Sequence, residues 1–250
     1  MKRDVLVRYL DDRLGIAAMD DISVNGLQVQ GRDEVEKVAL VTDAALALFN
    51  RAKDEDCDMI IAHHGIIWGG IKSITGRVYD QIKALMDNNI NLYAAHLPLD
   101  AHPELGNNAR LAKMVDLEEI SPFGRYHGVA IGVSGRLPAP LAPEALAKKW
   151  QLAVGGNPVV LPFGNNPITT VGIVSGGGSG ALEEAIGSGI DCFVTGEGRH
   201  ENHHTALEAG INIILLGHYH SETLGVQAVG KELETRFGLE TIFIDEPTIL

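Results

Sequence analysis

Histidine side chains follow three separate apolar runs in this chain, and carboxylates accompany two of them. The residues are His63 and His64 after the first run, His96 and Asp100 after the second, and His218 and Glu222 after the third. Imidazole and carboxylate ligands suit zinc, iron, manganese or nickel, and a carboxylate can bridge two such ions. A single His after a strand is more often a hydrogen-bonded turn or core residue. Three such strand ends in one chain need a common cause, so the pattern predicts a metal site.

The apolar runs are typical of buried strands, and amphipathic helical patterns separate them. Strands are predicted at residues 38–43, 58–62 and 90–95, and helices at residues 44–53 and 77–88. This alternation predicts a mainly parallel sheet, whose carboxyl strand ends form a ligand cleft. Pro98 disfavours helical geometry at Leu97, so the stretch from His96 to Asp100 is predicted to be a loop.

The sequence also carries an internal repeat. Residues 38–43 resemble residues 171–176, and residues 58–62 resemble residues 191–195 at the same offset. The third strands match as well, pairing Ile90 and Asn91 with Ile211 and Asn212, and His96 with His218. We therefore predict a duplicated α/β unit, with halves at residues 1–125 and 126–250 that could share one structural domain and its cleft. Residues 126–168 form an inserted connecting segment within the second half.

Composition limits the class of protein. The 250 residues are 45% hydrophobic and 21% charged, which is typical of a globular protein. The formal net charge of −13 argues against nonspecific binding to nucleic acid or to an anionic membrane. Cys57 and Cys192 are predicted to be buried free thiols in a reducing cytoplasm. No apolar run is long enough to span a bilayer and no signal-peptide pattern opens the chain, so we expect a cytoplasmic location.

A glycine-rich loop suggests a rival function. It consists of Gly176, Gly177, Gly178 and Ser179. The loop follows a predicted strand and meets a minimal dinucleotide-binding pattern, with Glu197 near the expected acidic position. The pattern is short, and its copy in the first half lacks the glycines, so a tight strand-to-helix turn is the favoured interpretation. A phosphate held by backbone N–H groups stays open as an alternative.

Other polar residues have less specific signals. His127 opens a predicted strand and is interpreted as a strand-edge histidine. His200 and His203 lie in a histidine-rich stretch and are candidate extra ligands, acid/base groups or solvated helix residues. Asn25 begins an Asn-Gly turn signal, and Gln28 follows it closely. The signal favours a hairpin or edge strand, and a ligand-facing role of Asn25 or Gln28 is left open.

Five motifs together resemble a known family. They are residues 23–28, 62–65, 96–108, 195–197 and 217–222. In this order they resemble the NIF-three-like family, the YbgI-type proteins that are often labelled GTP cyclohydrolase 1 type 2 homologues. The resemblance implies a duplicated three-layer α/β/α fold with mixed, mainly parallel sheets and a metal cleft between the halves. It also implies a toroidal homohexamer with a dinuclear metal centre in each subunit.

Carried over residue by residue, the resemblance implies metal ligands at His63, His64, Asp100, His218 and Glu222. His96 and Glu197 are candidates for positions beside these ligands or for additional ligands. The implied cofactor is two divalent ions per chain, with iron, zinc, manganese and nickel not distinguished by the ligand types.

Such a centre predicts hydrolysis. Two divalent ions can hold a hydroxide at neutral pH, because the pKa of bound water falls to about 7. The predicted function is a metal-dependent hydrolase acting on a nucleotide or other phosphorylated small molecule, with His127, His200 or His203 as proton carriers. The family label alone implies GTP cyclohydrolase-type activity. The alternatives are a metal-handling protein that stores, senses or delivers ions without substrate chemistry, and a partner-binding scaffold.

Overall fold

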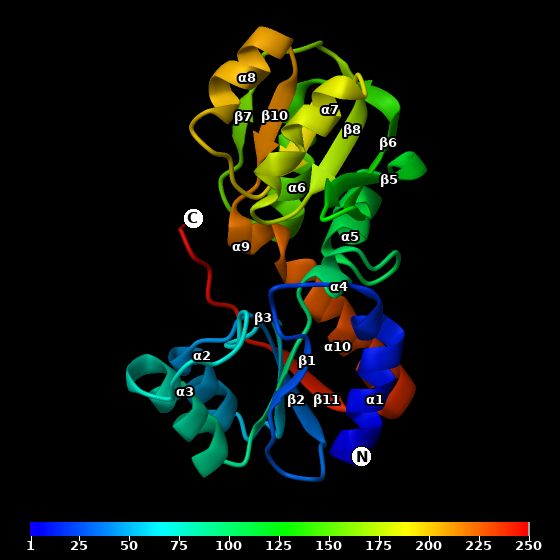
Figure 1. Cartoon of the computed structure of the whole chain (residues 1–250). Coiled ribbons are helices and arrows are strands. Elements are labelled where there is room, and N and C mark those ends of the chain that lie inside the picture. The colour runs from blue at the N-terminus through cyan, green and yellow to red at the C-terminus, as the bar shows by residue number, and fades with distance from the viewer. Residues whose placement is uncertain (250) are drawn as a thin grey trace. The chain divides into compact units, whose positions relative to one another are not determined.

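The computed structural model describes residues 1–249 and contains two compact units (Figure 1). Unit 1 comprises Met1–Leu99 and Gly225–Glu246, and unit 2 comprises Asp100–Leu224 and the described residues after Glu246. The expected division at residue 125 followed the sequence repeat, whereas the compact units are divided elsewhere. The units differ from these halves in two places, because residues 100–125 belong to unit 2 and the chain after Leu224 returns to unit 1.

Unit 1 is built on a five-stranded sheet with the order β1-β4-β3-β2-β11. The strands are β1 (Gly26–Val29), β2 (Lys37–Asp43), β3 (Met59–His64), β4 (Asn91–Ala94) and β11 (Glu240–Phe243). The helices are α1 (Arg3–Leu14), α2 (Leu46–Asp54), α3 (Gly76–Asp87) and α10 (Thr223–Phe237), with a 3-10 turn η1 (Ile16–Ala18). All neighbouring strands are parallel except β1 and β4.

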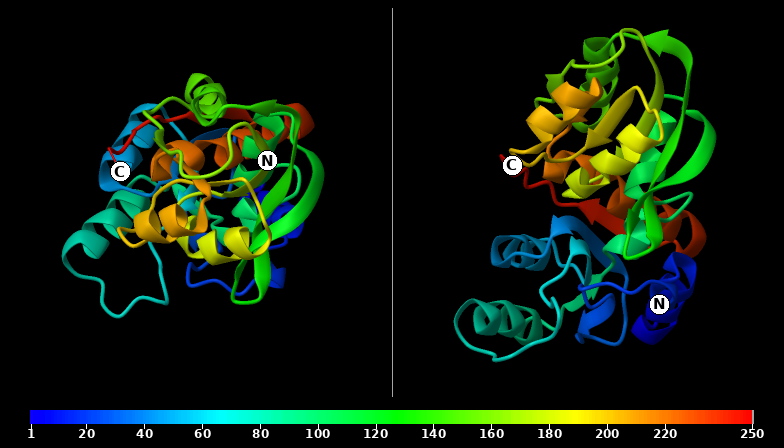
Figure 2. Two further views of the ribbon diagram at one scale, coloured as in Figure 1. Left: turned by 90° about the horizontal axis from the view of Figure 1, so that it is seen from above. Right: turned by 45° about the horizontal axis from the view of Figure 1, so that its top comes forward.

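Helices cover both faces of this sheet (Figures 1 and 2). On one face Ile60 and Ala62 pack with Phe49 of α2 and Leu85 of α3. The other face carries α1 and α10, where Gly230 of α10 lies directly against Leu40. Strands covered on both faces are buried along their whole length, as β3 is from Met59 to His63. Unit 1 is therefore a three-layer α/β/α unit.

Unit 2 is built on a six-stranded sheet with the order β5-β6-β8-β9-β10-β7. The strands are β5 (Glu118–Tyr126), β6 (Val129–Leu141), β7 (Val159–Leu161), β8 (Ile168–Val174), β9 (Cys192–Thr195) and β10 (Asn212–Leu215). The helices are α4 (Leu97–Asp100), α5 (Asn107–Met114), α6 (Pro143–Val154), η2 (Gly178–Ala181), α7 (Leu182–Gly187), α8 (Asn202–Ala209) and α9 (His218–Ser221), and α4 crosses the boundary between the units. Side chains of α5 and α6 pack on one sheet face, and side chains of α7 and α8 pack on the other.

The predicted duplication is confirmed in the strand order. The run β1-β4-β3-β2 in unit 1 has the same order and directions as β7-β10-β9-β8 in unit 2. Beyond this run the two sheets differ, because β11 is parallel to β2 whereas β6 is antiparallel to β8. The sheet of unit 1 is mainly parallel, and the β5–β6 hairpin makes the sheet of unit 2 mixed.

Two local predictions were wrong. The strand predicted to open at His127 begins at Val129, and His127 lies in the hairpin turn with φ 47° beside Gly128 at φ 85°. The stretch expected to be a loop around Pro98 is the short helix α4. Pro98 is tolerated there because it stands in the first helical turn, where its missing N–H would have no helical partner.

The Asn25–Gly26 signal marks an edge strand and no local hairpin, since β1 pairs with the distant β4. Among residues 1–249, no helix combines the length and apolarity needed to cross a bilayer.

Candidate metal centre

Three histidine rings converge at the carboxyl edge of the unit 1 sheet. His63 and His64 end β3, and His96 follows β4, its parallel neighbour. Each ring offers one nitrogen, and these three atoms lie within 4.8 Å of one another. The ring centroids are 4.6 Å apart for His63 and His64, and 5.2 Å apart for His63 and His96. The parallel register is the reason that residues distant in sequence meet here.

The nitrogen that each ring offers is fixed by hydrogen bonds at the other nitrogen. Nδ1 of His63 donates to the carbonyl oxygen of Ala95 at 2.9 Å, and Nδ1 of His64 donates to Asp43 at 2.8 Å. Nδ1 of His96 donates to Asp21 at 3.0 Å. Carbonyl and carboxylate oxygens only accept, so each neutral ring carries its proton on Nδ1 and its lone pair on Nε2. All three rings are therefore prepared to coordinate a metal through Nε2.

Asp21 is a positioning residue that sequence reasoning missed. Its side chain is 1% exposed and accepts from Nδ1 of His96, from the backbone N–H of Leu97 and from the backbone N–H of Ser23. Burial alone would raise the pKa of Asp21, but hydrogen bonds from His96 and Asn25 outweigh it and hold that pKa well below its usual range. A carboxylate two residues before the Ser-Val-Asn-Gly motif was the only available sequence signal.

Asn25 and Gln28 hold the loops around these histidines. The amide oxygen of Asn25 accepts from the backbone N–H of His96 at 2.7 Å. The amide oxygen of Gln28 accepts from the backbone N–H of Ile66 at 2.8 Å. A Cβ at Gly65 would lie 2.4 Å from Nε2 of Gln28, which explains the glycine after the His-His pair. These contacts give both polar residues a structural role beside the three rings.

Unit 2 supplies a buried carboxylate at Asp100, whose side chain is fixed by two donors. Its Oδ1 accepts from Nδ2 of Asn107 at 2.8 Å and from Oγ of Ser175 at 3.0 Å. Asn108 binds the same region, since its Oδ1 accepts from the backbone N–H of Ser175 at 2.7 Å. The two asparagines of the 96–108 motif therefore position Asp100 and the loop that follows β8.

His218 lies between two carboxylates of unit 2. Its Nε2 is 3.1 Å from Glu222, whose side chain is 3% exposed, and its Nδ1 is 3.3 Å from Glu197. The hydrogen bond to Glu222 raises the pKa of His218 to about 9; burial opposes this shift, and the charges of Glu222 and Glu197 add to it. A metal bound at these atoms would take the place of the proton that His218 holds, because coordination requires the neutral ring.

The backbone of the glycine-rich loop packs closely against Glu222 and His218. Gly176 has φ 59°, and a Cβ there would lie 1.9 Å from Oε1 of Glu222. A Cβ at Gly196 would lie 2.7 Å from the carbonyl oxygen of Gly176. Close packing of Glu222 against Gly176, and of Gly176 against Gly196, therefore requires these glycines.

The repeat register corrects one predicted pairing. The backbone N–H of Ala95 donates to Ala62, and that of Leu216 donates to Thr195 at the equivalent place. Ala95 therefore corresponds to Leu216, which makes Gly217 the counterpart of His96. The predicted equivalence of His96 and His218 was wrong by one residue. In the first copy His96 follows Ala95 directly, whereas in the second copy Gly217 lies between Leu216 and His218.

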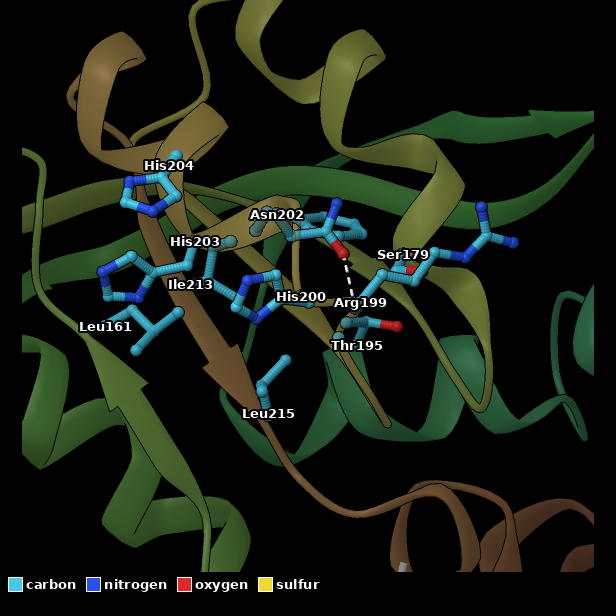
Figure 3. Close-up of a pocket in the computed structure, with 12 residues that line it drawn as sticks. Leu161, Ser179, Thr195, Arg199, His200, Asn202, His203, His204, Ile213 and Leu215 are labelled. Atoms are coloured by element: carbon cyan, nitrogen blue, oxygen red, sulfur yellow. Dashed lines mark hydrogen bonds between the residues drawn. The ribbon is translucent and has the colours of Figure 1, made fainter.

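The remaining candidate histidines do not join these groups. Among residues 1–249, the groups of three or more possible metal ligands include none of His127, His200 and His203. His127 lies on the β5–β6 turn with its ring against Tyr126. His200 and His203 line a cavity of about 430 Å³ in unit 2 (Figure 3).

The donor types fit first-row divalent ions. Three imidazole Nε2 atoms in unit 1, and in unit 2 the buried carboxylates of Asp100 and Glu222 with the imidazole of His218, suit zinc, iron, manganese or nickel. Nδ1 of each of these histidines lies against an oxygen atom, and the carboxylate of Asp100 accepts two hydrogen bonds. Metal ligands in proteins usually have hydrogen bonds of this kind.

Comparisons with known proteins agree over the whole chain. A family model described as Duf34/NIF3 (NGG1p interacting factor 3) matches residues 1–248. A protein of Archaeoglobus fulgidus named GTP cyclohydrolase 1 type 2 homolog is 47% identical over 245 residues, which are 98% of each chain. The crystal structure of TTHA1606 from Thermus thermophilus is 43% identical, with a TM-score of 0.92 and full coverage of both chains. The structure of protein ybgI, described as of unknown function, gives a TM-score of 0.93 at 34% identity, again with full coverage.

Proposed function

This chain belongs to the Duf34/NIF3 family, and from that premise we propose that it is a divalent-metal-dependent hydrolase of a nucleotide or another phosphorylated small molecule. The proposed ligands of two ions per chain are His63, His64, Asp100, His218 and Glu222. Relatives named GTP cyclohydrolase 1 type 2 homolog make guanine nucleotides the first compounds to assay.

One observation carries this proposal. Each of the three rings at the carboxyl ends of the unit 1 strands donates from Nδ1 to an oxygen, which leaves the lone pair of its Nε2 for a cation. The ligand atoms of the three rings lie within 4.8 Å of one another. Metal-ligating histidines usually have such a hydrogen bond at their other ring nitrogen. The arrangement favours cation binding over a purely structural role for the pair His63 and His64.

The chain's own residues would set the geometry of the reaction. When bound, divalent ions supply a Lewis acid and lower the pKa of bound water to about 7. Asp43 and Asp21 orient His64 and His96, and Asn107 and Ser175 orient Asp100. Glu197 holds His218 at Nδ1. Fixed orientation keeps these groups from reorganising during the reaction.

Elemental analysis tests the proposal most directly. We expect about two ions per chain in the protein as purified, as in two-metal hydrolases. His64→Ala removes a proposed ligand of unit 1, and Glu222→Gln removes one of unit 2, so both should lose metal. His204→Ala, at an exposed histidine outside the proposed set, is the matched control and should keep it.

Activity then separates the candidate functions. Metal-dependent turnover of guanine nucleotides or phosphoesters that His64→Ala abolishes would support the hydrolase. Exchangeable metal without turnover would instead support metal handling, and metal that affects only assembly would support a scaffold. Absence of metal after reconstitution would contradict the whole proposal.

We infer by the same resemblance that the chain forms a homohexamer in the cytoplasm. The exposed apolar residues Ile120 and Val129 on the β5–β6 hairpin, where β5 is an edge strand, support self-association. Both cysteines are buried free thiols, which suits a reducing compartment. Light scattering of the purified protein tests the assembly, and a monomer at micromolar concentration would contradict it.

A further inference from the structure

A cavity in unit 2 combines an apolar floor with a polar wall (Figure 3). Its volume of about 430 Å³ is within the range of small-ligand pockets. The floor is formed by alternate residues of neighbouring strands, which share one face of the sheet. These floor residues are Leu161, Phe193, Thr195, Ile213 and Leu215. Leu161 and Leu215 are half-buried, so apolar surface is available to a ligand.

The wall comes from the turn before α8 and the first turn of that helix. His200 and His203 lie near Leu161 and Leu215, whereas Arg199 extends the other way, past Ser179 (Figure 3). The cavity therefore has an imidazole end and a guanidinium end. The ring of His203 packs edge-on against Phe163 with centroids 5.0 Å apart, which limits its movement.

The guanidinium and imidazole groups of this wall have no hydrogen-bonding partner among the described residues. Across residues 1–249, no hydrogen bond or ion pair involves the Arg199 guanidinium or the rings of His200, His203 and His204. Only the turn itself is tied down, since the backbone N–H of Arg199 donates to Oδ1 of Asn202 at 2.6 Å. In a chain of net charge −13, an unpaired guanidinium at the wall of a cavity is a local site for an anion.

The cavity and the proposed metal ligands of the same unit share the glycine-rich loop. Ser179 belongs to the glycine-rich loop, where a Cβ at Gly177 would lie 3.5 Å from Oε1 of Glu197 and 3.9 Å from Cε1 of His218. Thr195 and Gly198, which also line the cavity, flank Glu197 in the chain. The glycine-rich loop therefore connects the guanidinium end of the cavity with the group around His218.

We propose that this cavity is the nucleotide-binding subsite, with the base between the apolar floor and the imidazoles of His200 and His203, and the phosphate at Arg199 and Ser179. The inference rests on the proposed function, because it assigns the substrate class of the same site. Apolar and aromatic surfaces accept the flat face of any base, so the cavity selects for a base bearing a phosphate more than for one particular base.

Equilibrium binding to the intact protein tests the subsite, using GMP, guanosine and inorganic phosphate as probes. Arg199→Ala should weaken GMP binding about tenfold, through loss of a charge-assisted hydrogen bond, and leave guanosine within about twofold. His203→Ala should weaken GMP and guanosine alike, by about fivefold or more, through loss of stacking. Lys149→Ala removes an exposed positive charge of unit 2 outside the cavity and should change neither.

The binding assay is repeated after chelation of metal. GMP binding that survives chelation and responds to Arg199→Ala supports the subsite even where hydrolysis is never found, so the two proposals fail separately. GMP binding that Arg199→Ala and His203→Ala leave unchanged overturns the subsite, as does binding that disappears completely with the metal. Each variant replaces an exposed residue, and circular dichroism verifies that it is folded.

Discussion

Asn91 and Asn212 make the same three side-chain hydrogen bonds in the two units. In unit 1, the amide oxygen of Asn91 accepts from Gly31, and its amide nitrogen donates to the carbonyl oxygens of Arg32 and Asp58. In unit 2, the corresponding partners of Asn212 are Gly164, Asn165 and Asp191. Both side chains are fully buried at the first position of a strand. The repeat therefore extends from strand order to individual hydrogen bonds.

Replacing either asparagine should destabilise its own unit. Asn91→Ala and Asn212→Ala each leave buried backbone groups without a partner, so we expect a loss of about 2–4 kcal/mol in the free energy of unfolding. Amide hydrogen exchange locates the effect: Asn91→Ala should accelerate exchange in β3, and Asn212→Ala in β9. Asn157→Ala, at an exposed position, should change neither, and a uniform effect of both variants on both sheets would contradict equivalent local roles.

Much of this fold could be predicted from the sequence because its strands are apolar along their whole length. Continuous apolar runs separated by amphipathic helices indicate parallel strands covered on both faces, and β2, β3 and β4 follow this pattern. The hairpin β5–β6 was harder to predict, because β5 is exposed over Glu118–Ser121 and lacks an apolar signal. The helix α10 returns to unit 1, where Gly230 packs against Leu40, and no local pattern encodes a contact between residues so distant in sequence.

The candidate site was predictable where its residues end strands. His63, His64 and His96 follow from parallel strands ending at one sheet edge. Asp21 and Asp43 were not predicted, because they are defined by what they contact across the fold. Acidic residues are also common at turns and strand ends, so their type carries no signal alone.

Gly176 should be irreplaceable by alanine. A Cβ there would overlap Glu222, and φ 59° is unfavourable for alanine, so we expect Gly176→Ala to cost at least about 1–2 kcal/mol and to lower the metal content. Gly180→Ala in the 3-10 turn η2, directly after this loop, is the control, since its Cβ would meet nothing within 4 Å and its φ is ordinary. Thermal unfolding and elemental analysis measure both effects. A Gly176→Ala protein with wild-type metal content would contradict the close packing of Glu222 as a requirement of the site.

Asp21 should support metal binding without touching the ion. Asp21→Asn replaces one acceptor oxygen by an amide donor, which conflicts with the N–H groups that Asp21 accepts and frees the ring of His96. Loss of such support typically lowers metal affinity by about 10–100-fold. Competition with a chelator measures the affinity, and Asp20→Asn, at the exposed neighbouring position, is the matched control. Equal affinities of the two variants would contradict a supporting role of Asp21 in metal binding.

The stability of unit 2 should depend on pH through Asp191. Burial alone would raise the pKa of Asp191, but hydrogen bonds from Thr169, Asn165 and Thr170 outweigh it and hold that pKa well below its usual range. Because the folded pKa is lower than the unfolded value of about 3.9, the carboxylate stabilises the fold fully above that value. This stabilisation is lost as the pH falls below the unfolded value toward the folded pKa.

The difference in unfolding free energy between wild type and Asp191→Asn measures this effect. We expect about 1–3 kcal/mol at pH 7, from the lost hydrogen bonds to an ionised acceptor, and a smaller difference as the pH falls below about 4. Urea unfolding at a series of pH values gives both numbers. Glu208→Gln neutralises an exposed carboxylate of the same unit and should show a difference near zero throughout. A difference for Asp191→Asn that stays constant from pH 7 to pH 3 would mean that the charge of Asp191 contributes nothing to the stability of unit 2.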